Sequence, residues 1–106
     1  MSQTEIAVKK WPDNQTAEPS VIETLVQAEN LPYYRWSNGP GDVYGAHHHD
    51  YHKVIYVLRG SITFGLPDVG KKITLYPGDR LDLPSGVRHV AVVGTHGVVC
   101  LEGHRT

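Results

Sequence analysis

The sequence of 106 residues has little of several features that would decide its class at once. It holds one cysteine, Cys100, so no disulfide can form within the chain, and we expect a cytoplasmic protein. Its apolar runs are far too short to span a bilayer, so we expect no membrane partner. It also lacks an excess of positive charge, because 10 Lys and Arg face 11 Asp and Glu. Without a basic block, we expect no nucleic acid partner.

Histidine is the residue type that stands out, and four of the seven histidines fall between His47 and His52. Strand residues two apart lie on the same face, about 6.6 Å from each other. The rings of His47 and His49 should therefore share a face and could converge on one ion, about 2.0–2.1 Å from each nitrogen. His48 would point the other way. A solvated loop that happens to be rich in histidine is the alternative, because short motifs often occur by chance.

From Asp42 onward, short strands alternate with clusters of Gly, Pro or Asp. The predicted strands cover residues 43–49, 53–58, 61–66, 72–76, 80–83, 87–93 and 98–102. This spacing indicates an all-β sandwich or barrel rather than βαβ units. Before it, we predict an edge strand at 6–8, a short helix that begins at Pro19 with Ser20 as its cap, and an aromatic strand at 33–37.

Most of these strands alternate between apolar and polar residues, which predicts one buried and one solvated face. The segments 53–58 and 89–93 differ, because apolar residues occupy both parities. Both of their faces must therefore be covered, by the N-terminal helix, the aromatic strand or a second subunit. Since a monomer rarely exposes a large apolar patch, we predict a homodimer.

A further histidine signal lies downstream, where His89 follows a segment with regularly spaced Gly and Pro residues. The two patterns consist of Gly41, His47, His49 and Gly60, and of Gly78, Pro84, Gly86 and His89. Together they resemble the two sequence motifs of the cupin superfamily, at the spacings of that family, over residues 41–93. The resemblance implies a small, RmlC-like cupin with an all-β fold: a double-stranded β-helix, or jelly-roll barrel, with a short N-terminal helix.

The length of the chain predicts one domain over residues 1–106. Residues 1–40 would form an N-terminal extension with the helix and the aromatic strand. Residues 41–93 would form the core that carries the motifs, and residues 94–106 the closing strand and tail.

The resemblance also implies that His47, His49 and His89 bind a divalent transition metal. Imidazole ligands do not show whether this metal is Fe, Ni, Zn, Mn or Cu. Two positions depart from the family pattern, because Lys53 replaces a glutamate ligand and Val93 replaces an asparagine. A protonated ammonium has no lone pair for a metal. We therefore expect the Lys53 side chain to carry its charge aside, toward water or a carboxylate.

Asp50 and Glu102 are the carboxylates that Lys53 could reach, and Glu102 could instead supply the missing acidic ligand. Asp50, His52 and Lys53 are candidates for binding substrate or orienting a ligand ring. Cys100 is predicted to be a small buried hydrophobe.

Other polar and aromatic residues receive structural interpretations. His96 lies in a glycine-flanked turn and His104 near the end of the sequence, so both are predicted to lie on the surface. Tyr34, Trp36 and Trp11 are predicted to belong to the core or to an interface.

The leading hypothesis is a metal-binding cupin that acts on a small, anionic molecule by dioxygenase, isomerase or decarboxylase chemistry. An anion is favoured because three neutral histidines leave the charge of the metal unbalanced. The alternatives are a non-catalytic, small-ligand-binding or sensory cupin and a metal-free barrel. A fold does not fix a function, so whether the protein is an enzyme stays open at this stage.

Overall fold

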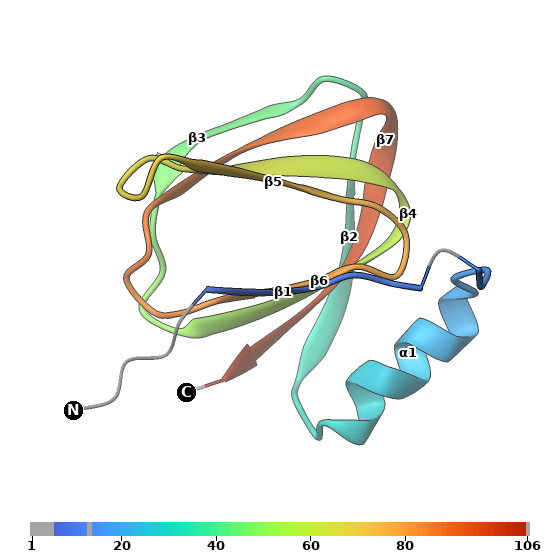
Figure 1. Ribbon diagram of the computed structural model, residues 1–106. Helices are drawn as coiled ribbons and strands as arrows, with labels where there is room; N and C mark the ends of the chain where they lie inside the picture. Colours follow the sequence, from blue (N-terminus) through green and yellow to red (C-terminus); the bar gives the residue numbers. More distant parts are fainter. Residues whose placement is uncertain (1–5, 13, 106) are drawn as a thin grey trace.

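The computed structural model describes residues 6–12 and 14–105, so both ends of the expected domain over 1–106 lie outside it. The described elements are β1 (Ala7–Lys9), α1 (Pro19–Ala28), β2 (Tyr33–Asn38), β3 (Val43–His47), β4 (His52–Leu66), β5 (Lys71–Leu75), β6 (Arg80–Leu83) and β7 (His89–Arg105). The described strand pairs are antiparallel, and the strands close around one interior (Figure 1). This is the all-β jelly roll expected from the sequence.

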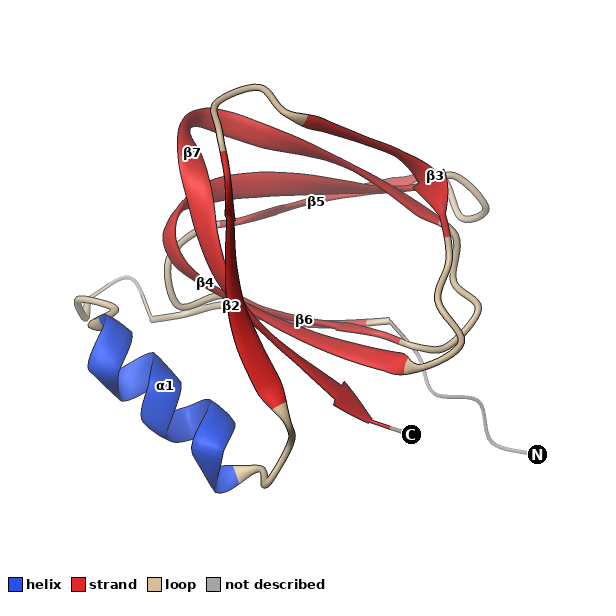
Figure 2. Ribbon diagram, turned by 180° about the vertical axis from the view of Figure 1, so that it is seen from behind, coloured by secondary structure: helices blue, strands red, loops and turns tan. Residues whose placement is uncertain are grey.

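Strands β4 and β7 are long and bent, and they contribute to two layers of the barrel (Figure 2). The first half of β4 pairs with β6, and its second half pairs with β5. Between these halves, the pairing of β4 with β7 changes register on either side of Gly60. A strand that bends in this way can pair in one layer and then continue into the other.

The predictions of separate strands at 53–58 and 61–66, and at 87–93 and 98–102, are therefore wrong, because each pair forms one continuous strand. The glycines that were predicted to end these strands instead lie where the strands bend. Gly60 and Gly97 adopt φ angles of 74° and 75°, which glycine reaches without the steric cost of a Cβ atom. The strands turn at these positions without ending.

The main core lies between the two layers of the barrel. Its buried residues are Ile55, Val57, Ile62, Phe64, Leu66, Leu75, Leu81, Leu83, Ala91, Val93, Val98 and Cys100. Cys100 is fully buried, as predicted, and burial raises the pKa of its thiol to about 12. At neutral pH this thiol stays protonated and acts as a small hydrophobe.

Helix α1 lies against the outside of the barrel (Figure 1). Its buried residues Ile22 and Val26 pack in a second cluster with Val54, Tyr56 and Leu58 of β4. Of the three covers considered for the segment 53–58, the helix supplies it. The outer face of β7 is different, because Val92 is 46% exposed. The exposed apolar residue on this face of β7 favours the homodimer, which remains a prediction.

The helix starts at Pro19, as predicted, but the predicted cap is wrong. Glu18 is the N-cap residue, and no side chain caps the first turn. Proline suits the first helical position because its ring fixes φ and its missing N–H needs no partner. Ser20 therefore lies inside the helix, where its carbonyl accepts a hydrogen bond from Thr24. In the described part of the chain, no helix has the length and hydropathy needed to cross a membrane.

Candidate metal centre

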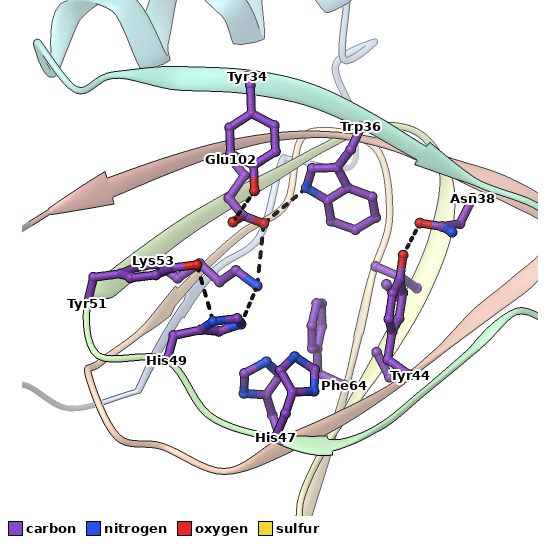
Figure 3. Close-up of a pocket in the computed structure, with 13 residues that line it drawn as sticks. Tyr34, Trp36, Asn38, Tyr44, His47, His49, Tyr51, Lys53, Phe64 and Glu102 are labelled. Carbon is purple, nitrogen blue, oxygen red and sulfur yellow. Dashed lines mark hydrogen bonds and ion pairs between the residues drawn. The ribbon is translucent and has the colours of Figure 1, made fainter.

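Three histidines predicted to bind a metal lie together on one cavity of about 290 Å³. Figure 3 shows two of them, His47 and His49, side by side at this cavity. His47 ends β3 and is the direct cross-strand partner of His89, which begins β7. His49 follows two residues after His47. One ring nitrogen from each histidine lies within 4.8 Å of the others. The exposed His48 is not part of this group.

Backbone hydrogen bonds set the tautomers of two of these rings. Nδ1 of His89 donates to the carbonyl of Val87 at 3.0 Å, and Nδ1 of His47 donates to the carbonyl of Gly45 at 2.7 Å. A carbonyl can only accept, so each Nδ1 carries the proton and each Nε2 carries a lone pair. Metal-binding histidines are usually oriented by such a bond on the other ring nitrogen.

His89 is the most buried of the three histidines, with 2% of its surface exposed. Burial is the main cause that lowers its pKa, to about 4, so the ring is neutral at pH 7. Its Nε2 is buried and has no hydrogen-bond partner among the described residues. A buried polar atom without a partner costs free energy, and in a native fold it needs an explanation.

His49 is held differently, by side chains instead of the backbone. Its Nδ1 lies 3.2 Å from the hydroxyl of Tyr51, and its Nε2 lies 3.3 Å from Nζ of Lys53. The same Nζ lies 3.4 Å from Oε1 of Glu102, so the ammonium stands between the two groups (Figure 3). The Lys53 side chain thus reaches one of the two carboxylates that the sequence analysis named.

Glu102 is 3% exposed, and its two oxygens have several partners. Oε1 accepts from the indole of Trp36 at 3.0 Å, and Oε2 accepts from Tyr34 and from His104, both at 2.7 Å. Burial would raise the pKa of this carboxyl, but the bonds from His104 and Tyr34 and the charge of Lys53 hold it below its usual value. Glu102 is therefore a carboxylate, and it lies outside the group of three histidines.

The structure corrects two residue interpretations. Tyr34 was predicted to belong to the core or an interface, but it lines the cavity. Trp36 packs against the main core, as predicted, and also lines the cavity. His104 was predicted on the surface, but it binds Glu102 and its ring lies 4.0 Å from that of Tyr51. The alternation of Tyr34, Trp36 and Asn38 could have indicated a shared face. The contacts of Tyr34 and Trp36 with Glu102 follow from the pairing of β2 with β7, which no local pattern predicts.

Two candidates do not reach the cavity. Nε2 of His52 lies 2.9 Å from the carboxylate of Asp82, and Asp50 is exposed. Neither residue lines the cavity. His96 is exposed, as predicted, and Trp11 packs against the second core cluster.

The pKa of His89 leads to a prediction about the metal-free protein. The unfolded chain binds a proton at this ring below about pH 6.5, whereas the folded chain binds it only below about pH 4. The free energy of unfolding should therefore be highest above pH 6.5 and fall toward pH 4.5, by about 1–2 kcal/mol. The full shift would give about 3 kcal/mol, but the open cavity screens part of it. His49, whose pKa burial also lowers, adds to the same trend.

Urea unfolding of chelator-treated protein at several pH values between 4.5 and 7 measures this effect. The His89→Gln variant should show a smaller loss toward acid pH, and His96→Gln, changed at an exposed ring, should behave like the parent. An equal loss in His89→Gln and the parent would contradict the prediction. The depressed pKa values of Glu102 and Asp82 change the free energy of unfolding little above pH 4.5, because these carboxylates lose their stabilising effect at lower pH.

Comparisons with known proteins agree with this fold. The family model for the Cupin domain matches residues 34–103. No curated protein sequence matches the chain. A DUF861 family protein from Thermotoga maritima is similar in structure, with a TM-score of 0.64, 22% identity, and 95% of this chain and 100% of that chain covered. At this identity the similarity concerns the fold alone.

Two enzymes are among the similar solved structures. The polyketide cyclase RemF from Streptomyces resistomycificus has a TM-score of 0.63 and 28% identity, with 70% of this chain and 53% of that chain covered. The 3,4-ketoisomerase QdtA from Thermoanaerobacterium thermosaccharolyticum, solved as a double mutant with TDP, has a TM-score of 0.56 and 29% identity. That match covers 71% of this chain and 58% of the ketoisomerase. The chain thus spans little more than half of either enzyme.

Proposed function

Because this chain belongs to the Cupin domain family, we propose that His47, His49 and His89 bind a divalent transition metal, where a small anionic molecule is processed. The observation that carries the proposal is Nε2 of His89, which is buried and lacks a partner in the described part of the chain. A metal ion would use this lone pair and relieve the cost of burying it. Three neutral imidazoles with oriented rings suit a transition metal.

A metal at this position would supply a Lewis acid for oxygenation, isomerisation or decarboxylation of a bound oxygen-bearing molecule. The charge balance of the surrounding residues favours an anion. The three histidines are neutral ligands, and the charge of Glu102 is already matched by Lys53. Lys53 lines the cavity and can donate a charge-assisted hydrogen bond to a carboxylate or enolate.

The side chains that line the cavity favour a small, flat ligand. Five aromatic side chains line it: Tyr34, Trp36, Tyr44, Tyr51 and Phe64. Such rings exclude water and offer faces for stacking on a conjugated group. The two enzymes with similar structures support a catalytic role, and a non-catalytic ligand-binding domain is the alternative.

The test begins with metal analysis of protein purified without a histidine tag. The metal-loaded protein is then titrated with a carboxylate, a β-dicarbonyl and a catechol, and O₂ uptake and product formation are followed. We expect at least one of these compounds to bind in its anionic form, and Lys53→Met to weaken that binding about tenfold, because a hydrogen bond to a charged group is lost. Lys72→Met, changed at an exposed lysine on β5, should have no effect.

The outcomes separate the three hypotheses for this protein. Binding with turnover supports the enzyme. Binding without turnover supports the non-catalytic domain. Protein that takes up no metal would be a metal-free barrel, and the proposal would be wrong.

A further inference from the structure

The ammonium of Lys53 has two partners that a bound metal would affect differently. Nζ lies 3.3 Å from Nε2 of His49 and 3.4 Å from Oε1 of Glu102. Lys53 is 9% exposed, so its charge has little access to bulk water. A buried charge is strongly destabilising unless it is paired, so this ammonium depends on these two groups.

The contact with His49 uses the lone pair that a metal would need. An ammonium is only a donor, so Nε2 must be the acceptor in this pair. The proton of the neutral ring is then on Nδ1, which faces the hydroxyl of Tyr51. Nε2 of His49 can therefore serve the ammonium or a metal, but not both at once.

The carboxylate of Glu102 is held in a position where it can bind the ammonium without His49. It is fixed by the indole of Trp36, the hydroxyl of Tyr34 and the ring of His104. Oε1, the oxygen nearest to Nζ, keeps its position through the bond from Trp36. The position of this oxygen therefore does not depend on the contact between the ammonium and His49.

We propose that Lys53 competes with the metal for Nε2 of His49, and that Glu102 is a positioning residue that holds the ammonium aside in the metal-bound state. This inference rests on the proposed metal binding by the three histidines. It gives Glu102 control over metal affinity without any contact with the ion. Without Glu102, the buried ammonium keeps His49 as its one partner among the described residues and opposes the ion more strongly.

The test is a double-mutant cycle in which the affinity for Zn²⁺ alone is measured by calorimetry on the full, untagged chain at neutral pH. Lys53→Met should tighten Zn²⁺ binding about tenfold or more, because a charge-assisted bond no longer has to be broken. Glu102→Gln should weaken it about tenfold. In the Lys53→Met background, the same Glu102→Gln change should weaken it no more than about threefold, because no ammonium remains to be held aside.

A second readout follows the His49 ring directly. In the metal-free protein, the ¹⁵N resonance of Nε2 should shift when Lys53 becomes Met, and Zn²⁺ should shift it in both proteins. Glu102→Gln should also shift this resonance in the metal-free protein, because the ammonium then depends on His49, whereas a merely structural role of Glu102 would leave it unchanged. The double variant Lys53→Met/Glu102→Gln controls for misfolding, because replacing both members of a buried ion pair is often tolerated.

The outcomes distinguish this inference from the function on which it rests. An equal effect of Glu102→Gln in both backgrounds, with Zn²⁺ still bound by the parent, overturns the role of Glu102 and leaves the metal site intact. Unchanged affinity in Lys53→Met overturns the competition. Absence of Zn²⁺ binding in the parent and in Lys53→Met overturns both proposals.

Discussion

Replacing His47 and His89 together with alanine should abolish stoichiometric metal in the protein. The two rings are cross-strand partners, and the double change leaves His49 as the only member of the group. Loss of a group that merely orients a ligand already costs about 10–100-fold in metal affinity, so loss of two ligands should cost at least about a hundredfold. Mass spectrometric metal analysis and equilibrium dialysis with Zn²⁺ measure the result.

The matched control removes the same number of histidines from the surface. His48 and His96 are both exposed and lie outside the group. The double variant His48→Ala/His96→Ala should keep the metal content of the parent. Equal metal content in the two double variants would remove the basis for the metal site.

Gly60→Ala should strongly destabilise the fold. At this bend of β4, a Cβ atom would lie 1.9 Å from the carbonyl oxygen of Gly97 and 2.8 Å from its carbon. The φ of 74° adds the strain that any L side chain meets in this region. Because both obstacles are backbone atoms, the two long strands must separate where they turn between layers. We expect a loss of at least about 3 kcal/mol in the free energy of unfolding.

The Gly70→Ala variant separates the effect of the steric clash from the effect of backbone strain. Gly70 also has a positive φ, of 65°, but no atom of residues 6–12 or 14–105 outside its immediate neighbours lies within 4 Å of the position that a Cβ would take. This variant should lose about 1–2 kcal/mol from backbone strain alone. Urea unfolding of both variants gives the comparison. Similar losses in the two would show that the approach of Gly97 to Gly60 is not what restricts this position.

The sequence by itself determined the fold class and a candidate ligand set. The separation of two residues predicted that the rings of His47 and His49 converge, although β3 ends at His47 and His49 lies just beyond it. The alternation of short strands and turns indicated an all-β fold, and the resemblance of the two motifs to those of cupins implied a jelly roll. These signals are local, because they depend on backbone preferences and on neighbours along the chain. The same reasoning failed at Gly60 and Gly97, because a glycine that bends a strand and a glycine that ends one look alike in sequence.

Only the tertiary structure decided what surrounds the histidines. The pairing of β2 and β4 with β7 brings Tyr34, Lys53 and Glu102 to one cavity, although they are far apart in sequence. It also separates His52 and Asp50 from that cavity, although they are neighbours of His49 and Lys53 in the chain. The physical reason is that partners for buried charges come from neighbouring strands that are far apart in the sequence. Their choice depends on register and on the bends of long strands, which no short stretch of sequence encodes.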